Sequence, residues 1–334
     1  MSQRSAPVAV VTGASAGVGR AVALRFAEGG FAVGLIARDD AALQAMRSEI
    51  EASGGKAVAV AADVADAQAV MDAADHVARD LGPITVWINN AMVTVISPAA
   101  AMTAEEYRRV TEVTYLGAVH GTMAALKHMK PRDGGCVIQI GSALAYRGLP
   151  LQSAYCGAKH AIRGFSESVR SELIHDGSSV RLMMVDLPAV NTPQFDWART
   201  HVPRTPRPMG TPAQPEAIAE GVFRAAQGGG RDYWIGWTTA LTVLGNAVLP
   251  GFLDRYLATA VEGQQTAIPA TRTRRDNLLK PVSGAHRTAG SFSDEARSSA
   301  PLLPAGAARV GVVAAGALAC MAIGATIAAA IRRR

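Results

Sequence analysis

The stretch "VAVVTGASAGVGRA" (residues 8–21) decides how the first part of this chain folds. Residues 8–13 have the composition of a buried strand, and a helical pattern follows over residues 17–28. Between them, Gly13, Gly17 and Gly19 allow a sharp strand-to-helix turn and a close approach of a ligand to the backbone. Free N–H groups and the helix dipole at such a turn hold a pyrophosphate, so the stretch predicts a dinucleotide site rather than only a tight loop.

The same alternation of apolar runs and helical patterns continues along the first two-thirds of the chain. The predicted strands are residues 8–13, 31–38, 57–62, 84–90, 136–142, 180–186 and 232–237. The predicted helices between them are residues 17–28, 40–52, 66–80, 104–129, 154–175 and 214–227. Continuous apolar strands that alternate with helices are typical of a parallel sheet covered on both faces. We therefore expect an α/β fold, a Rossmann-type doubly wound parallel sheet of about seven strands.

Composition and charge narrow the function classes. The chain has 334 residues, of which 49% are hydrophobic and 18% charged, and this is ample for a large core. Residues 1–236 carry 22 basic and 22 acidic side chains, so the net charge of +6 lies entirely in the C-terminal part. A core without a basic excess argues against nucleic-acid binding. The three cysteines and seven histidines fall in no metal signature, and we predict no metal site.

The N-terminal residues bear on location. Before the glycine-rich turn they contain only a five-residue apolar run, too short for the hydrophobic region of a signal peptide. We therefore expect the α/β domain in the cytoplasm, and the few, widely spaced cysteines fit a reducing compartment.

The end of the second predicted strand, "LIAR", bears on cofactor choice. An acidic residue there usually binds the adenosine ribose of NAD, but this chain has Ala37 and Arg38. Because a guanidinium pairs with a 2′-phosphate, the sequence favours NADP(H), with NAD(H) as the second choice. A solvated arginine at a strand end is the simpler interpretation of the same residue.

"YCGAK" (residues 155–159) supplies a second chemical signal. Tyr155 and Lys159 are one helical turn apart and therefore lie on one face. A nearby ammonium favours the phenolate, so the spacing predicts a Tyr155 pKa below its usual value of about 10. Such a phenol can donate or accept a proton near neutral pH.

Five motifs in this order resemble those of the short-chain dehydrogenase/reductase family. They are "TGASAGVG" (12–19), "ADV" (62–64), "NNAM" (89–92), Ser142 in "IGSALA", and "YCGAK" (155–159). Ser142 precedes Tyr155 by 13 residues, the spacing usual in that family. The resemblance covers about residues 5–237. It implies an NADP(H)-binding catalytic domain over residues 1–237 that interconverts a carbonyl and an alcohol on a small substrate.

The resemblance also implies roles for individual residues. Tyr155 would exchange a proton with the substrate oxygen, Ser142 would hydrogen-bond that oxygen, and Lys159 would hold the nicotinamide ribose and lower the phenol's pKa. The expected cofactor-binding residues are Gly13, Ser15, Gly17, Val18, Gly19, Arg38, Asp63, Val64, Asn90, Ala91, Tyr155, Lys159, Pro188 and Thr192. The resemblance also implies a homo-oligomer, a dimer or tetramer, because family members often pair through the helices that correspond to residues 104–129 and 154–175.

Three positions depart from the family pattern. Thr114 stands where the family has a catalytic asparagine, and its hydroxyl could hold a relay water. Met92 and Ala189 replace glycines of the usual "NNAG" and "PG" motifs. These changes leave a second interpretation open, a catalytically weak or idle dinucleotide-binding scaffold. The intact set of Ser142, Tyr155 and Lys159 favours the enzyme.

Residues 189–213 are long, proline-rich and basic, and such an excursion suits a lid over the substrate. Phe195 and Trp197 could line an apolar pocket there. Two interpretations are open for the basic residues of this segment, Arg199, Arg204 and Arg207. They either contact an anionic group of the ligand or belong to a solvated loop.

The C-terminal part differs in character from the rest. The composition of residues 238–309 predicts an extension or linker. Residues 310–331 are a run of 22 residues without a charged side chain. At about 1.5 Å per residue, a helix of this length would span about 33 Å, enough for a bilayer core. We expect residues 310–331 to form an apolar, membrane-associated or transmembrane helix. A buried helix in an oligomer and a poorly ordered tail are the alternatives.

Overall fold

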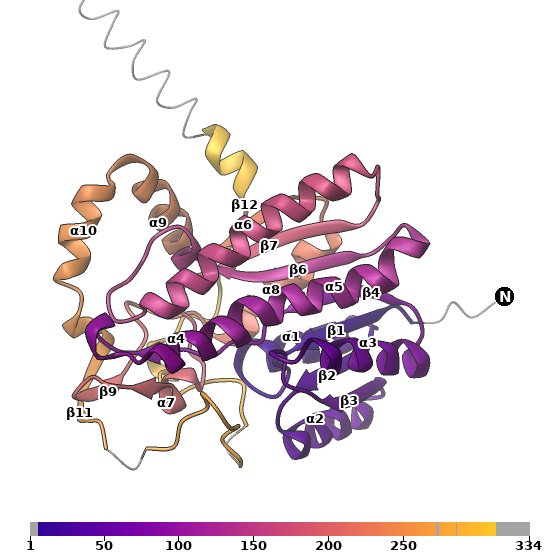
Figure 1. The fold of residues 1–334 in the computed structure, drawn as a ribbon, viewed down its shortest axis with the longest axis horizontal. Coiled ribbons are helices and arrows are strands. Elements are labelled where there is room, and N and C mark those ends of the chain that lie inside the picture. Colours follow the sequence, from indigo (N-terminus) through magenta and orange to yellow (C-terminus); the bar gives the residue numbers. More distant parts are fainter. Residues whose placement is uncertain (1–5, 272–273, 285, 312–334) are drawn as a thin grey trace, which may run out of the picture.

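A central sheet of eight strands organises the molecule (Figure 1). The computed structural model describes residues 6–271, 274–284 and 286–311. In spatial order the strands are β12 (Leu302–Pro304), β10 (Asp232–Ile235), β7 (Arg181–Leu187), β6 (Cys136–Ser142), β4 (Ile84–Asn89), β1 (Val8–Thr12), β2 (Ala32–Ala37) and β3 (Ala57–Ala61). Seven of them are parallel, at the seven places that the apolar runs predict.

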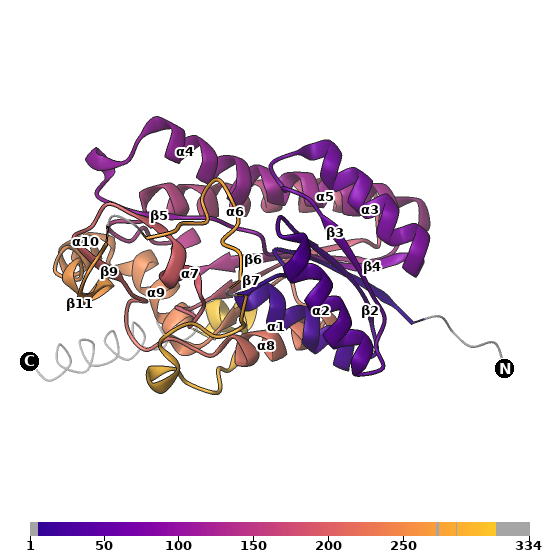
Figure 2. The ribbon, with the colours of Figure 1, turned by 90° about the horizontal axis from the view of Figure 1, so that it is seen from below.

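Helices cover both faces of the sheet, as Figure 2 shows. One layer consists of α1 (Gly17–Glu28), α2 (Asp40–Ala52) and α8 (Pro215–Gln227), and the other of α3 (Ala67–Leu81), α4 (Ala104–Val110), α5 (Gly117–Met129) and α6 (Ser153–His175). Each layer encloses a core cluster of its own against the sheet. The strands are apolar without alternation because both faces are buried in this way. The predicted helix over 104–129 is interrupted by a π-helical segment, Thr111–Leu116, between α4 and α5.

The strand order positions a ligand site. β1 lies between β2 and β4, so the chain reverses its direction of winding beside β1. In open α/β sheets, ligands bind at the carboxyl ends of the strands on either side of such a switch point. The turn with Gly13 follows β1, and Asn90 follows β4, so both lie at this edge.

The eighth strand corrects the predicted strand count. β12 comes from the C-terminal extension and pairs antiparallel with β10, Trp234 opposite Leu303. Only three residues long, it lies in a segment rich in alanine, serine and proline, which carries no strand pattern. It forms because the outer edge of β10 would otherwise present unpaired N–H and C=O groups.

The rest of the extension folds onto the domain. Two helices, α9 (Trp237–Val248) and α10 (Pro250–Ala258), follow β10. β11 (Gln265–Pro269) pairs with β9 (Arg204–Pro206), and β5 (Val95–Ile96) pairs with β8 (Arg199–Thr200), beside the short helix α7 (Gln194–Trp197). Residues 274–284 and 286–304 then run across the molecule, largely without regular structure.

The predicted apolar helix over 310–331 lies outside the described residues, apart from its first two positions. Those two positions end a helical segment over residues 305–311. Among the helices described here, none combines the length and apolar character that a bilayer crossing needs.

Candidate active site

A cavity of about 600 Å³ opens at the carboxyl ends of the central strands. This volume lies within the range of about 300–1,000 Å³ typical of small-molecule sites. The predicted site residues that line it are Gly13, Ser15, Gly17, Val18, Arg38, Asp63, Val64, Asn90, Ala91, Ser142, Tyr155, Lys159, Pro188 and Thr192. Two predicted residues, Gly19 and Thr114, do not line it.

The turn after β1 shows why its residues must be glycines. Gly13 has φ +67°, and a Cβ there would lie 2.8 Å from Ala91 Cα. A Cβ on Gly19 would lie 2.1 Å from the carbonyl oxygen of Gly13 and 2.4 Å from Asn90 Nδ2. Gly19 therefore packs behind the turn and lets α1 approach the sheet, whereas Gly13 shapes the floor of the cavity.

The turn fits a dinucleotide phosphate. Within the described chain no side chain caps the N-terminus of α1, and its first N–H, that of Gly17, donates to the carbonyl oxygen of Arg287 at 3.1 Å. The N–H groups that follow Gly17 in the first turn are the ones that could hold a ligand phosphate. Asn90 holds the turn from the neighbouring strand end, because its Nδ2 donates to the carbonyl oxygens of Thr12 (3.0 Å) and Gly13 (3.3 Å). The Thr12 hydroxyl in turn accepts from the N–H groups of Asn90 and Ala91.

Ser142, Tyr155 and Lys159 meet at one wall of the cavity. Ser142 ends β6, and its hydroxyl accepts a hydrogen bond from the N–H of Leu144 at 3.1 Å. Tyr155 and Lys159 lie on successive turns of α6, with Lys159 Nζ 5.6 Å from the centre of the Tyr155 ring. Lys159 Nζ donates to the carbonyl oxygen of Ile140 at 2.6 Å, which draws the ammonium toward β6.

The predicted direction of the Tyr155 pKa is wrong. Burial raises the pKa of the phenol well above its ordinary value, and the hydrogen bond with Ser142 opposes this only in part. Lys159 does not reverse the shift, because its ammonium is itself buried: burial lowers the pKa of Lys159 to about 8. Tyr155 is therefore protonated at neutral pH, the form that donates a proton.

Asp186 is a buried carboxyl next to this group that the sequence analysis did not single out. It lies on β7 in register with Gly141, between Ile140 and Ser142, and it is fully buried. Tyr146 donates a hydrogen bond to its Oδ2 at 3.0 Å, while Oδ1 has no partner within the described part of the chain. Burial raises the pKa of Asp186 to about 7.

Thr114 braces the loop after β4 and does not reach the cavity. Its hydroxyl accepts from the N–H of Val93 at 3.1 Å and donates to the carbonyl oxygen of the same residue at 2.9 Å. The proton of the hydroxyl is therefore already committed to a backbone carbonyl, and the side chain is 1% exposed. The predicted relay water has no place in this arrangement, and Thr114 is a positioning residue.

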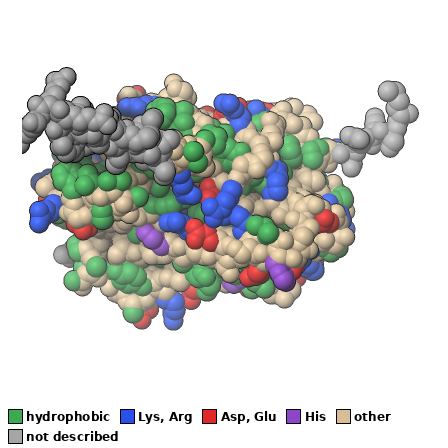
Figure 3. All heavy atoms as spheres, turned by 90° about the horizontal axis from the view of Figure 1, so that it is seen from above, with side chains coloured by type: hydrophobic (Ala, Val, Ile, Leu, Met, Phe, Trp, Pro, Cys, Tyr) green, Lys and Arg blue, Asp and Glu red, His purple; other side chains and the backbone are tan. Residues whose placement is uncertain are grey.

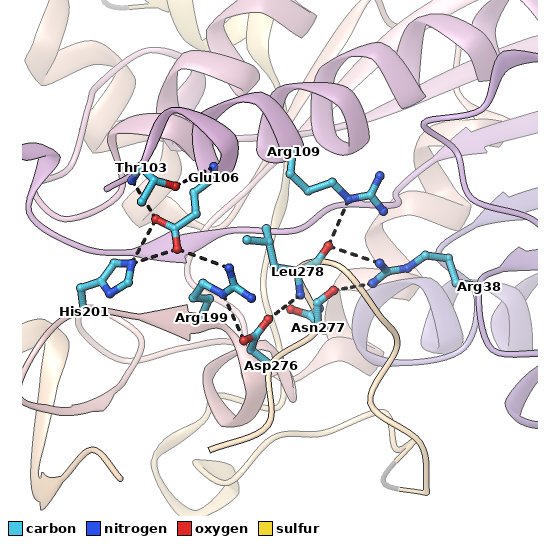
Figure 4. Close-up of polar contacts among 9 residues, drawn as sticks. All are labelled: Arg38, Thr103, Glu106, Arg109, Arg199, His201, Asp276, Asn277 and Leu278. Carbon is cyan, nitrogen blue, oxygen red and sulfur yellow. Dashed lines mark hydrogen bonds and ion pairs between the residues drawn. The ribbon is translucent and has the colours of Figure 1, made fainter. Parts of the chain in front are cut away.

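The predicted lid lies where expected, and Phe195 and Trp197 line the cavity. Its basic side chains meet carboxylates of this same chain. Arg199 Nε donates to Asp276 at 3.0 Å, and His201 Nε2 lies 2.9 Å from Glu106, which also caps α4 through Thr103 (Figure 4). Arg204 and Arg207 likewise pair with Glu262 and Glu295. The arginines therefore hold the lid to its surroundings.

A further wall comes from residues 274–284 and 286–293, which we call the C-terminal strap. Arg38 Nη2 donates to the carbonyl oxygen of Asn277 at 2.5 Å and Nη1 to that of Leu278 at 3.3 Å (Figure 4). Arg109 Nε donates to the same Leu278 oxygen at 3.1 Å and also forms an ion pair with Asp63. Leu278 is 1% exposed and packs among core residues, so it holds the strap in place.

The strap continues toward the glycine-rich turn and the lid. His286 Nε2 lies 2.8 Å from Asp39, and the N–H of Gly17 donates to the carbonyl oxygen of Arg287 at 3.1 Å. Arg287 also pairs with Asp196 on α7 at 2.6 Å. The strap thus links the end of β2, the start of α1 and the lid.

These contacts escaped the sequence analysis for a simple reason. Arg38 and Leu278 are 240 residues apart, and the partners of Arg38 are backbone carbonyls that every residue carries. The residues of α9 and α10 that line the cavity are Thr238, Thr239, Leu241, Thr242, Leu253, Tyr256 and Leu257. They follow no catalytic pattern and are recognised only by their position.

Comparison with known proteins agrees with this geometry. The family model described as short chain dehydrogenase matches residues 7–202. The chain belongs to the short-chain dehydrogenase family. Within it, the chain is 33% identical over 276 residues to the uncharacterized oxidoreductase YxnA of Bacillus subtilis, covering 81% of this chain and 77% of that protein.

Two solved structures with a similar fold extend the comparison. An alcohol dehydrogenase from Thermococcus sibiricus, complexed with 5-hydroxy-NADP, is 27% identical with a TM-score of 0.58, covering 66% of this chain and 90% of the other. A short-chain dehydrogenase from Streptomyces avermitilis is 26% identical with a TM-score of 0.64, and the match covers 78% of this chain and 96% of the other. The chain is accordingly an oxidoreductase of this family.

Proposed function

We propose that this short-chain dehydrogenase is an NADP(H)-dependent enzyme that interconverts a carbonyl and an alcohol on a small apolar substrate. The observation that carries the proposal is the meeting of Ser142, Tyr155 and Lys159 at one wall of the cavity that the glycine-rich turn also lines. A scaffold that only bound a dinucleotide would not need these three groups together.

Tyr155 performs the proton transfer in this proposal. When bound, the nicotinamide cofactor supplies a hydride to the carbonyl carbon or takes one from the alcohol. Tyr155, protonated at neutral pH because of its raised pKa, gives its proton to the carbonyl oxygen in reduction and recovers it in oxidation. Ser142 donates a hydrogen bond to the same oxygen and stabilises the charge that develops there.

Lys159 contributes a buried donor at the cofactor side of Tyr155. Its ammonium is anchored by the carbonyl of Ile140 and has a pKa of about 8. A lysine of such a pKa keeps most of its charge at neutral pH, and that charge favours the phenolate left behind after proton transfer.

Arg38 and the composition of the far wall support the choice of cofactor and substrate. Arg38 lines the cavity at the end of β2, and its guanidinium keeps N–H donors beyond the two that the strap accepts. A relative in complex with NADP and the one with 5-hydroxy-NADP support the same cofactor. Most side chains of the far wall are apolar: Leu144, Leu149, Phe195, Met209, Leu241, Leu253 and Leu257. Polar side chains also line the cavity there, among them Thr238, Thr239 and Thr242 of α9.

Transfer of deuterium tests the proposal. The enzyme is incubated with NADPH labelled with deuterium at both C4 positions and with a cell extract rich in lipids, and products are analysed by mass spectrometry. We expect a labelled alcohol with the wild type. With Tyr155→Phe its yield should fall at least about 100-fold, because general acid catalysis contributes a factor of about this size or more.

Tyr107→Phe is the matched control, because Tyr107 bonds Ser153 at 2.6 Å outside the cavity. Both variants must still bind NADPH, as measured by fluorescence. Equal labelling by Tyr155→Phe would show that another group supplies the proton. No label with a wild type that binds both NADPH and NADP would contradict the proposed reaction.

A further inference from the structure

The outer surface of α9 and α10 is unusually apolar. Six of its large hydrophobic side chains are 54–69% exposed: Trp237, Leu241, Val248, Leu249, Phe252 and Tyr256. We call them the apolar rim. Figure 3 views this face from above, with hydrophobic side chains gathered at its left end, where α9 and α10 lie. Single exposed apolar residues are ordinary, but a cluster on two consecutive helices marks an interaction surface.

The rim surrounds an opening of the cavity. Leu241 and Tyr256 both belong to the rim and line the cavity, so the cavity reaches the surface between α9 and α10. Leu253 and Leu257 continue the apolar lining inward from there. A ligand that entered by this route would pass along hydrocarbon side chains from the surface to the reacting groups.

The chain toward the uncharged C-terminal stretch leaves the domain beside the rim. Ala305 is fully buried against Ala240 and Val243 of α9, with Ala308 packed on the same cluster. The guanidinium of Arg309 then lies 5.4 Å from the ring of Trp234. Residues 310–331, which contain no charged side chain, therefore start next to the rim.

The charges near the rim favour one kind of partner. α9 has no charged residue, and the single acidic residue of α10, Asp254, is paired with Arg147. Within the described residues, Arg255 and Arg309 form no ion pair. Arg255 lies on α10 between Phe252 and Tyr256, whose rings stack at 6.3 Å, and Arg309 lies over the ring of the buried Trp234. Aromatic rings with a polar edge and nearby arginines are typical of protein surfaces at anionic membranes.

We propose that the apolar rim and residues 310–331 together dock this protein on an anionic lipid bilayer, with the cavity opening toward the lipid. The docking stands on the rim and the adjoining uncharged stretch alone. The route by which an apolar substrate would enter from the bilayer rests in addition on the proposed function.

Trp237 offers a direct test with the full-length chain. Its side chain is 62% exposed, whereas Trp87 and Trp234 are fully buried. The protein is mixed with vesicles of phosphatidylcholine and phosphatidylglycerol (3:1) in which part of the phosphatidylcholine carries brominated acyl chains. We expect quenching of tryptophan fluorescence in the wild type and at least a threefold smaller quenching in Trp237→Phe. Attachment through residues 310–331 alone would leave Trp237 unquenched and would overturn the proposal.

A double variant, Leu249→Asp with Phe252→Asp, tests the rest of the rim. Both side chains are more than half exposed and neither lines the cavity, so folding and NADPH binding should persist. Each apolar group withdrawn from lipid weakens docking about tenfold or more, and we expect the quenching of Trp237 to disappear. Ile174→Asp, at an equally exposed apolar position on α6, is the matched control and should quench like the wild type.

Sedimentation velocity separates the competing partner, a second copy of the chain. A dimer in the absence of lipid that the double variant, but not Ile174→Asp, converts to monomers would mean that the rim pairs subunits and would overturn membrane docking. Because none of these measurements involves turnover, their failure is distinguishable from a failure of the proposed reaction.

Discussion

Replacing Asp186 by asparagine should change how the stability of this protein depends on pH. Burial is the main reason why the carboxyl has a pKa of about 7 instead of 3.8, with a smaller contribution in the same direction from Asp232. The hydrogen bond from Tyr146 works in the opposite direction. The folded state therefore favours the protonated carboxyl, whereas the unfolded chain ionises it near pH 4.

The direction in which stability changes with pH follows from this difference between the folded-state and unfolded-state pKa of Asp186. Below about pH 4 Asp186 is protonated in both states and its ionisation has no effect on the free energy of unfolding. As the pH rises from 4 to 7, the unfolded state releases the proton first, so the wild type loses stability. A shift of about three pH units corresponds to about 4 kcal/mol at 1.36 kcal/mol per unit. The side-chain amide in Asp186→Asn does not ionise, and its oxygen can still accept the hydrogen bond from Tyr146.

The assay is urea unfolding followed by circular dichroism at pH values from 4 to 8, with linear extrapolation to water. The free energy of unfolding of Asp186→Asn, relative to the wild type, should increase by about 4 kcal/mol across this range. Taking the difference removes the contributions of other carboxyls, such as Asp75, whose pKa is lowered chiefly by its hydrogen bond with Lys127. Asp72→Asn, on an exposed face of α3, is the control and should show no such trend. If the difference in the free energy of unfolding between Asp186→Asn and the wild type did not change with pH, the interpretation of Asp186 as a buried, readily protonated carboxyl would be refuted.

Three further predictions concern the cofactor site and its braces. Arg38→Ala should raise the dissociation constant for NADPH by about 10-fold or more while that for NADH changes less than about threefold, because only the first loses a charge-assisted hydrogen bond; fluorescence titration measures both. Thr114→Ala should lower the free energy of unfolding by about 1–3 kcal/mol, since the N–H and C=O of Val93 lose their buried partner; Thr114→Ser should restore most of this loss in urea unfolding. Leu278→Ala should lower the free energy of unfolding by about 2–5 kcal/mol through loss of buried contacts, and proteolysis within residues 270–290 should become faster; an unchanged cleavage rate would mean that Leu278 does not hold the strap.

Local sequence patterns account for most of the fold and for part of the site. Seven strands were predictable because each is a continuous apolar run bounded by helices, and both properties are local. The turn at Gly13 and the pair Tyr155 and Lys159 were predictable for the same reason, since spacing along a strand, turn or helix fixes which residues meet. These residues line one cavity because the carboxyl ends of parallel strands meet at the same edge of the sheet.

The sequence alone determined the sheet, the glycine-rich turn and the set of candidate reacting groups. Only the tertiary structure decided how those groups behave. The pKa of Tyr155 is raised because many distant residues exclude water from it, and spacing to Lys159 says nothing about that burial. The partners of Arg38 come from a strap 240 residues away in the sequence. The eighth strand, β12, forms because the C-terminal extension passes along the unpaired edge of β10. Burial and backbone pairing between remote segments depend on the whole packed chain, and for that reason they leave no local signature in the sequence.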